Sequence, residues 1–320
     1  MSVNKRDKLR LPQRKKASVA LKKDSAIYLP TYHFLKSEFQ HARRHEAGLI
    51  RDDDTEFLHQ YRVSLRRCRA LLSLLSAIFL PQQKQMIQNA LKTLMQKTNE
   101  LRDLDVYLGN MEPYFDALDH EYHQGLILFF NDLQDRRIVL QKQIKDWLKS
   151  ADYQQQCTQI VGLLDELNVK PTDAGKKPCL PFAKKCIWKH FNKTQNVCQS
   201  IGYANPDEHI HELRISCKKL RYLLEYFAPI FPRKVMKDHI KQLKALQDSL
   251  GYFSDSAVQI DFLNQYLEQQ KPGSKRHNAI SRLLTFSQKQ HADHKISVID
   301  HVNQYAFAAP QKSFEKIYKP

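Results

Sequence analysis

Two stretches of this chain share one pattern. Residues 59–72 read HQYRVSLRRCRALL, and residues 211–224 read HELRISCKKLRYLL. In each stretch, basic residues recur every three or four positions, and apolar residues recur at the same spacing one position earlier. Because an α-helix turns once in about 3.6 residues, the pattern predicts two helices that each carry a charged stripe beside an apolar one.

The apolar stripe of each helix is its predicted core face. Its members are Tyr61, Leu65, Cys68, Leu72 and Leu75 in the first copy, and Leu213, Cys217, Leu220, Leu224 and Phe227 in the second. The neighbouring stripe is basic. We call the set His59, Arg62, Arg66 and Arg69 the first basic rail, and the set His211, Arg214, Lys218 and Arg221 the second basic rail. Each rail is about 15 Å long at about 1.5 Å rise per residue.

A solvated helix face is the ordinary alternative to a binding function for such a stripe. A solvated face usually mixes signs, whereas these stripes hold almost no carboxylate before Glu225. Like charges at this spacing cost a few tenths of a kcal/mol per pair, so an unmixed stripe suggests an anion that offsets the cost. The same stripe also occurs twice with histidine in the same place, which favours function.

The similarity between the two halves extends beyond the rails. Adding 152 to a position in the first half gives its counterpart, which takes Lys92 to Lys244 and Asp103 to Asp255. No insertion is needed from about residue 33 to residue 108. The sequence therefore predicts an internal duplication of a multi-helix unit, which is too long for a solenoid repeat.

These segments resemble a known family. HQYRVSLRRCRALL and HELRISCKKLRYLLEYF are similar to the two hallmark segments of the CHAD family, the conserved-histidine α-helical domain, and LRDLDVYL and LKALQDSLGYFSDSAV resemble the segments that follow each hallmark. The resemblance covers about residues 26–307. It implies an all-α fold of two four-helix bundles related by approximate two-fold symmetry, and a non-catalytic activity, the binding of inorganic polyphosphate along basic surfaces that line a central cavity.

The resemblance also implies which residues contact polyphosphate. They are the two basic rails, with Arg67 and Lys219 on further basic positions of the motif. To these predicted contacts we add the lysines that the offset relates, Lys92 and Lys244. In the second hallmark Lys218 and Lys219 keep the charge but lack the planar fork of arginine. The family's frequent companion, the triphosphate tunnel domain with its ExExK motif, has no counterpart here, so we expect a stand-alone binding protein. A cytoplasmic location at polyphosphate granules is implied by the resemblance alone.

Composition agrees with a helical protein that binds polyanions. The chain has 320 residues, 42% of them apolar and only 8 of them glycine, which favours long helices around a core. Its formal net charge of +17 predicts attraction to polyphosphate, nucleic acid or an acidic membrane surface. The sequence has no apolar run long enough for a transmembrane helix, and its six cysteines form no CxxC pair, so we expect reduced thiols.

Breaks in the pattern predict the organisation of the chain. We expect a mobile basic arm at 1–25, bundle one at about 26–167, a linker at 168–182, bundle two at about 183–307, and a frayed tail at 308–320. In bundle one, we expect a first helix at 32–49, a second in the hallmark, a third at 83–101 and a fourth directly after residue 101. The helical stretches 120–149 and 153–167 are expected to be connecting material. In bundle two, a third helix should end at Gly251, a fourth should span 253–269, and a last one 275–291.

Other classes of function leave fewer marks in this sequence. No cofactor or metal site is predicted, because the histidines lack a Cys, Asp or Glu set at ligand spacing and no glycine-rich phosphate loop occurs. No nucleophile-plus-base pair is evident, so we expect no enzyme. The neighbouring arginines should lower the pKa of His59 and His211, leaving neutral donors to phosphate. A single-strand nucleic-acid binder, or an adaptor for a polyphosphate-metabolising enzyme, remains the alternative.

Overall fold

The computed structural model describes residues 9–14, 20–167, 171–307 and 310–320. Parts of the expected arm 1–25, linker 168–182 and tail 308–320 therefore lie outside the described residues. Within the described part, helices make up the regular structure, apart from one isolated antiparallel bridge between Ala26 and Pro178. The fold is all-α, as predicted. None of the helices in this part is both long and apolar enough to cross a membrane.

The described chain packs as two compact units. Unit 1 comprises Ser25–Gly109 and Leu133–Pro178 with the N-terminal segment up to Leu21, and unit 2 comprises Lys22–Asp24, Asn110–Asp132 and Cys179–Pro320. This division is not the single boundary at 168–182 that we expected. Residues 110–132 belong to unit 2 because their aromatic side chains pack there, with the ring of Phe129 4.8 Å from that of Tyr266.

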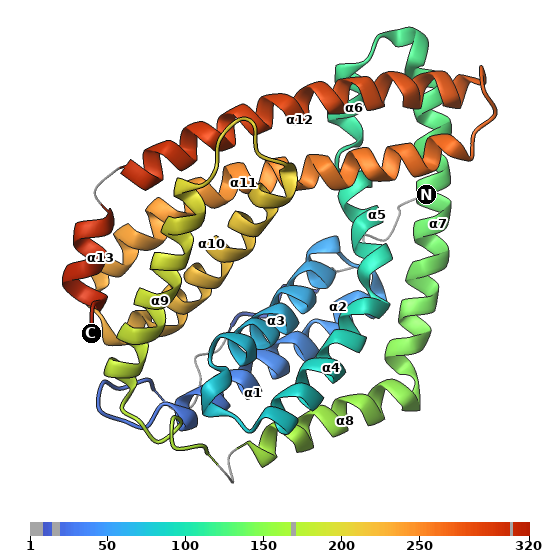
Figure 1. The fold of residues 1–320 in the computed structure, drawn as a ribbon. Helices are drawn as coiled ribbons and strands as arrows, with labels where there is room; N and C mark the ends of the chain where they lie inside the picture. The colour runs from blue at the N-terminus through green and yellow to red at the C-terminus, as the bar shows by residue number, and fades with distance from the viewer. Residues whose placement is uncertain (1–8, 15–19, 168–170, 308–309) are drawn as a thin grey trace. The chain divides into compact units, whose positions relative to one another are not determined.

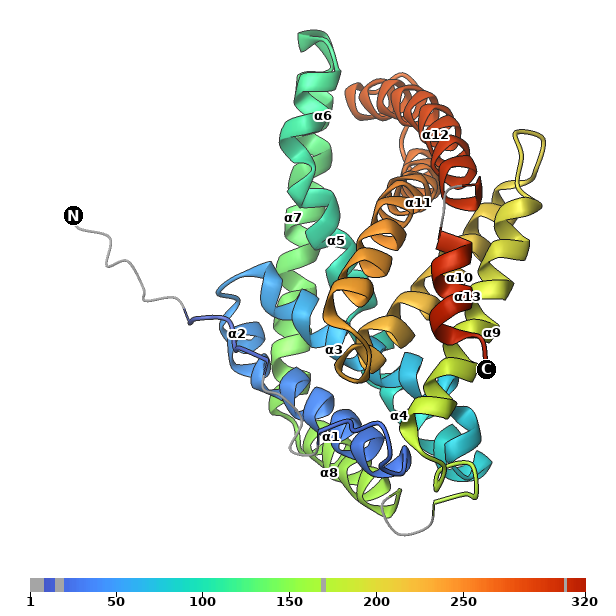
Figure 2. The ribbon, with the colours of Figure 1, turned by 90° about the vertical axis from the view of Figure 1, so that its left-hand side faces the viewer.

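Four helices of unit 1 close a bundle in which each contacts two others. They are α1 (Tyr28–Arg44), α3 (Thr55–Leu74), α4 (Pro81–Lys97) and α8 (Ala151–Glu166) (Figure 2). The short α2 (Glu46–Arg51) and a 3-10 turn at Ser76–Ile78 connect them, and α5 (Asn99–Gly109) follows α4. The expectation that α8 is connecting material was wrong. It is a bundle helix because Tyr153, Cys157, Ile160 and Leu164 are buried.

The hallmark helix α3 forms as its sequence predicts. Asp54 is its N-cap and accepts a hydrogen bond of 2.8 Å from the backbone N–H of Glu56, which satisfies one of the free donors at the helix start. Its predicted core stripe, from Tyr61 to Leu75, is no more than 1% exposed. Each such side chain contributes about 1.5–3 kcal/mol by leaving water, so this stripe fixes which way the basic rail faces.

The two halves differ at one helix break. In unit 1, α4 ends at Lys97, and Thr98 (φ −110°, ψ 4°) separates it from α5. In unit 2 the equivalent segment is uninterrupted, because α11 runs from Arg233 to Glu268. The expected end at Gly251 and separate helix 253–269 were therefore wrong. One glycine costs a helix only about 1 kcal/mol, and the buried Leu250 and Phe253 on either side hold α11 together.

Unit 2 is built around a second closed set of four helices. They are α9 (Cys179–Gln199), α10 (Asp207–Phe227), α11 and α12 (Lys275–Phe307), which lie side by side in Figure 1. The predicted core stripe of α10 is fully buried. The short α6 (Met111–Ala117) packs against α12, and the long α7 (His120–Lys149) contributes its first residues to this unit.

The C-terminal segment is a packed helix and not a frayed tail. Helix α12 continues past His291 to Phe307, and α13 (Pro310–Tyr318) packs against α9. The ring of Phe314 stacks on Phe191 with centroids 4.1 Å apart, and Tyr318 is fully buried. His239 holds the helix by hydrogen bonds to Tyr318 (3.1 Å) and Ser313 (2.8 Å). The expectation failed because the apolar partners of α13 are distant in the sequence.

The described part of the N-terminal arm is attached to unit 1. The backbone N–H of Leu9 donates to Asp53 at 3.0 Å, and Arg14 donates to the buried carboxylate of Glu38 at 2.6 Å. The expectation of a mobile arm is therefore wrong for residues 9–14. A buried carboxylate needs a cation close by, and here the arm supplies one.

Candidate functional site

The first basic rail lies on α3 beside its buried stripe, and its members are not equivalent. Arg62 is only 8% exposed. Its guanidinium donates to the Met95 carbonyl (2.9 Å), the Thr98 hydroxyl (2.8 Å) and the Asn99 amide oxygen (2.9 Å). These acceptors are the end of α4 and the break that follows it, where helical carbonyls lack intrahelical partners. Arg62 therefore caps α4, and this predicted contact residue is a structural one.

Arg66 and Arg69 remain available for an anion. Both are half-buried, and among the described residues neither forms an ion pair with a carboxylate. Arg69 makes a long contact of 3.5 Å to the sulfur of Met95. Arg102, on the following helix α5, adds a third half-buried guanidinium close enough to influence His59. Sequence analysis missed Arg102, although its position in the LRDLD segment directly after the helix break was a signal.

His59 is a neutral member of the first rail. It is half-buried, and burial lowers its pKa, with Arg102 as the next largest cause and Arg66 and Arg62 behind it. The predicted direction is thus correct for His59, but burial and not the neighbouring arginines is the main cause. A neutral imidazole can donate one hydrogen bond to a phosphate oxygen without adding charge.

Arg67 lies one position round the helix from the rail and is held internally. Its Nε lies 3.5 Å from the carboxylate of Glu38, which is 3% exposed and also binds Arg14. Its guanidinium also lies over the ring of Phe34, 5.6 Å from the centroid. One buried carboxylate thus neutralises part of the charge of two arginines, and Arg67 is a poorer candidate contact than Arg66 or Arg69.

The second basic rail lies on α10 and carries its own carboxylates. Arg214 donates to Asp255 at 3.2 Å, and Arg221 donates to Glu225 at 2.6 Å and to Gln247 at 3.1 Å. Asp255 therefore holds a rail arginine. Asp255 is 73% exposed, so its pair with Arg214 is a surface one that salt screens. His211 is exposed, and Lys218 and Lys219 are half-buried.

Equivalent positions in the two halves lie beside equivalent basic residues, but the side chains at these positions differ in type. Under the 152-residue offset, Met95 beside Arg69 corresponds to Gln247 beside Arg221. The offset also takes Glu38, the partner of Arg67, to His190 in unit 2. Burial lowers the pKa of His190 to about 4, with Lys189 and Lys219 adding to the effect. A carboxylate therefore offsets Arg67 in unit 1, whereas Lys219 faces a neutral imidazole.

The last two predicted contacts, Lys92 and Lys244, are exposed lysines on α4 and α11. Each lies three residues before the side chain that its rail arginine contacts, Met95 or Gln247. This spacing is one helical turn, so both ammonium groups lie on the rail side of their helix.

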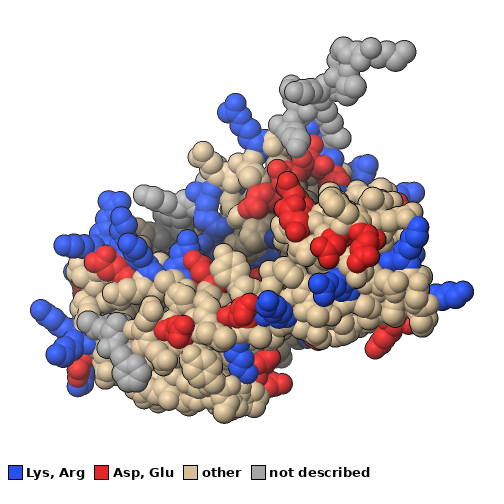
Figure 3. All heavy atoms as spheres, turned by 90° about the horizontal axis from the view of Figure 1, so that it is seen from above, with Lys and Arg blue, Asp and Glu red and all other residues tan. Residues whose placement is uncertain are grey.

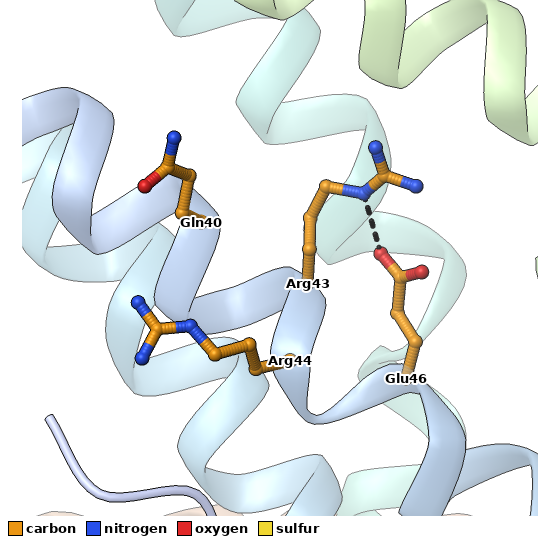
Figure 4. A pocket seen from close by; sticks show the side chains of 4 residues that line it. All are labelled: Gln40, Arg43, Arg44 and Glu46. Atoms are coloured by element: carbon orange, nitrogen blue, oxygen red, sulfur yellow. Dashed lines mark hydrogen bonds and ion pairs between the residues drawn. The ribbon is translucent and has the colours of Figure 1, made fainter.

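One face of the molecule carries charges of both signs. On the face that Figure 3 draws, Lys and Arg side chains are interspersed with Asp and Glu. A shallow hollow of about 500 Å³ lies where α1 meets α2 in unit 1, lined by Gln40, Arg43, Arg44 and Glu46 (Figure 4). Arg43 is bound there to Glu46 at 2.9 Å. None of the predicted contact residues lines this hollow.

Unit 2 contains a Ser–His–Asp arrangement that sequence analysis missed. His291 lies 2.8 Å from the Ser256 hydroxyl and 3.0 Å from the carboxylate of Asp207, which Lys295 also binds. The contacts follow the order of a hydrolase triad. However, Ser256 is 6% exposed, and its hydroxyl donates to the Phe253 carbonyl at 2.8 Å. A nucleophile must reach its substrate, and the buried Ser256 cannot do so. We therefore interpret these hydrogen bonds as structural contacts that join α10, α11 and α12.

Thiol chemistry and a metal site with three or more protein ligands have little support in the described residues. No group of three or more His, Cys, Asp or Glu side chains there is placed to hold a metal ion. The six cysteines all lie in the described part and form no disulfide bond, and five of them are buried. Burial raises the pKa of the Cys186 thiol to about 11, which makes it a weak nucleophile at neutral pH.

Comparison with known proteins identifies the family. The family model for the CHAD domain matches residues 33–264, more than half of the chain, and this chain belongs to the CHAD family. Its fold matches the crystal structure of the CHAD domain from the plant Ricinus communis, with a TM-score of 0.74 at 22% identity over 93% of this chain and 96% of that one. PptA from Streptomyces chartreusis matches with a TM-score of 0.68 at 11% identity, over 88% and 99%. No curated protein matches the sequence.

Proposed function

We propose that this chain binds inorganic polyphosphate without transforming it, through the basic rails of α3 and α10. The observation that carries the proposal is the pair Arg66 and Arg69. These are two half-buried arginines on a hallmark helix of the CHAD family, without a carboxylate partner among the described residues. Arginine forks bind phosphate oxygens in pairs, and each charged hydrogen bond is worth about 1.5–3 kcal/mol.

Polyphosphate suits this arrangement better than nucleic acid does. A chain of phosphates offers charge and oxygen acceptors at every unit and needs no base recognition. Binding of single strands draws on exposed aromatic rings on which bases stack. Beside the rails, Tyr61 is fully buried and Tyr222, next to Arg221, is half-buried. The rails therefore offer phosphate contacts with little stacking surface.

The absence of catalysis is part of the same proposal. The Ser256–His291–Asp207 arrangement is closed to substrate. The rails combine histidine with arginine and lysine, which bind phosphate oxygens and include no hydroxyl or thiol nucleophile. Phosphate release from polyphosphate in the presence of Mg²⁺ or Mn²⁺ would contradict this part of the proposal and would favour an enzymatic role.

The test is a titration of the whole chain with polyphosphate, a single-stranded RNA of matched charge, and ATP, across a salt series. Polyphosphate should bind most tightly, and its affinity should fall steeply with salt because bound counterions are released. The variant Arg66→Ala/Arg69→Ala/Arg214→Ala/Arg221→Ala should keep its helicity and lose polyphosphate binding. Arg62 is left intact because it caps α4. Unchanged affinity in the folded variant, or a preference for RNA, would overturn the proposal.

A further inference from the structure

Two histidines at the start of α7 approach one another in an unusual way. His120 is the first residue of the helix and His123 lies three residues later, in unit 2. Their Nδ1 atoms are 3.3 Å apart, and their ring centroids are 4.6 Å apart. The Nε2 of His123 faces two backbone carbonyls, Phe115 at 3.1 Å and Leu118 at 3.0 Å.

These contacts determine the tautomer of His123. A carbonyl oxygen only accepts, so Nε2 carries the proton and donates to both carbonyls. The Nδ1 atom of the neutral ring therefore carries the lone pair, and it points toward His120. This is the arrangement found around protein metal ligands, in which the second ring nitrogen donates to a carbonyl and holds the ring in place.

We propose that His120 and His123 chelate one divalent transition-metal ion through their Nδ1 atoms. At Zn–N distances of about 2.0–2.1 Å, two ligands of a tetrahedral ion lie about 3.3–3.4 Å apart, which matches the separation seen here. Imidazole suits Zn²⁺, Cu²⁺ and Ni²⁺. Water or an anion fills the remaining positions, since the described residues supply no third ligand of the Cys, His, Asp or Glu type.

Charges around the pair favour a cation despite its place at a helix start. The positive end of the helix dipole opposes a metal ion there. Asp119 and Glu121 flank His120 in the sequence, and Asp116 lies four residues before it on α6, all three exposed. His120 is exposed as well, so its ring is free to turn toward the ion.

The chain offers a matched control for this site. His291 and His294 on α12 have the same three-residue spacing, but both ring nitrogens of His291 are already engaged by Ser256 and Asp207. That pair cannot chelate without breaking those bonds. Spacing alone therefore predicts two sites, whereas the structure predicts one.

The test uses the whole, reduced chain with Zn²⁺ for calorimetry and Cu²⁺ for electron paramagnetic resonance. We expect His120→Ala to weaken Zn²⁺ binding by more than about tenfold, and His123→Gln to do the same while its amide retains a donor for the loop carbonyls. His294→Ala should leave the affinity unchanged. Cu²⁺ should show two nitrogen ligands in the wild-type protein and one in His120→Ala.

Equal Zn²⁺ affinity in His120→Ala and the wild-type protein would overturn the proposal, as would an equal loss in His294→Ala. The site contains none of the rail residues. Polyphosphate affinity measured without metal should therefore be the same in His120→Ala as in the wild-type protein, so failure of either proposal leaves the other standing.

Discussion

Arg62 on α3 and Arg214 on α10 occupy equivalent places in the two hallmarks and have different roles. Arg62 is buried against the end of α4, where it donates to three neutral acceptors. Arg214 is half-buried and donates to an exposed carboxylate, Asp255. The cause is the break at Thr98, which brings a carbonyl, a hydroxyl and an amide oxygen together as acceptors for Arg62. The equivalent segment of α11 continues as a helix. A shared motif therefore does not imply a shared role.

The other arginines of the two hallmark helices differ in whether a carboxylate neutralises their charge. In unit 1 the carboxylate of Glu38 serves Arg67 and Arg14, which leaves Arg66 and Arg69 without one among the described residues. In unit 2 the carboxylates lie on the rail arginines themselves, Asp255 on Arg214 and Glu225 on Arg221. An incoming polyanion must displace these pairs on α10 but not on α3. We therefore expect the first rail to contribute more affinity.

The largest expected effect separates the two rails. Arg66→Ala/Arg69→Ala should weaken polyphosphate binding by about 100-fold, because two charged hydrogen bonds are lost. Arg214→Ala/Arg221→Ala should weaken it by only about tenfold, because each of these arginines is already paired with a carboxylate and contributes less to binding. Calorimetric titration at one fixed salt concentration measures both.

A control variant separates rail contacts from net charge. Arg136→Ala/Arg282→Ala removes two exposed arginines that lie outside the rails, and it should change the affinity by less than about threefold. If the α3 and α10 variants lose equal affinity, the asymmetry between the rails is wrong. If the control loses as much as they do, binding depends on overall charge alone.

The second effect concerns folding. Arg62→Ala should lower the free energy of unfolding by about 2 kcal/mol, because the acceptors at the end of α4 lose a charged donor. Arg214→Ala should cost less than about 1 kcal/mol, as expected for a surface pair. Urea denaturation compares the two. Well below its midpoint, Arg62→Ala should bind polyphosphate within about threefold of the wild-type protein, and a large loss would make Arg62 a contact residue after all.

The third effect is a pH dependence of the free energy of unfolding. It arises from His190, which occupies the position in unit 2 that Glu38 occupies in unit 1. The pKa of His190 is about 4 in the folded chain, against about 6.5 for an exposed histidine. Below pH 6.5 the unfolded chain takes up a proton that the folded chain refuses, so stability falls as the pH falls toward 4. Between pH 7 and pH 5 the free energy of unfolding should therefore fall by roughly 2 kcal/mol less in His190→Gln than in the wild-type protein.

Denaturation at the two pH values provides the measurement, with His209→Gln at an exposed position as the control. The variant should retain some sensitivity to acid, because burial also lowers the pKa of His41 and His239 to about 4. An unchanged pH dependence in His190→Gln would show that His190 is protonated as easily in the folded chain as in the unfolded one.

The smallest effect should be the same in both units. Lys92→Ala and Lys244→Ala each remove an exposed ammonium group next to a rail, and each should weaken polyphosphate binding about two- to threefold at low salt. The difference in affinity between each lysine variant and the wild-type protein should vanish at high salt, where screening removes contributions from exposed charges. A loss at one lysine that exceeds the loss from the rail arginines would move the binding surface away from α3 and α10.

Local patterns predicted the helices that carry the rails. Apolar residues at helical spacing placed Tyr61 to Leu75 and Leu213 to Phe227 in the core, and those stripes are buried. The expected range 120–149 also matches the ends of α7. Expectations failed where a distant segment decides the outcome. Helix α8 joins the bundle of unit 1, α13 packs on α9, and residues 110–132 pack in unit 2.

The sequence by itself determined that two amphipathic helices with basic stripes exist, because periodicity is a property of neighbouring residues. Only the tertiary structure decided which arginines those stripes leave available. The guanidinium of Arg62 is committed by a helix break 36 residues away, and Arg67 by a carboxylate on α1 that also binds the N-terminal segment. The partners of a long cationic side chain come from whichever elements pack beside it, and its own stretch of sequence does not contain them.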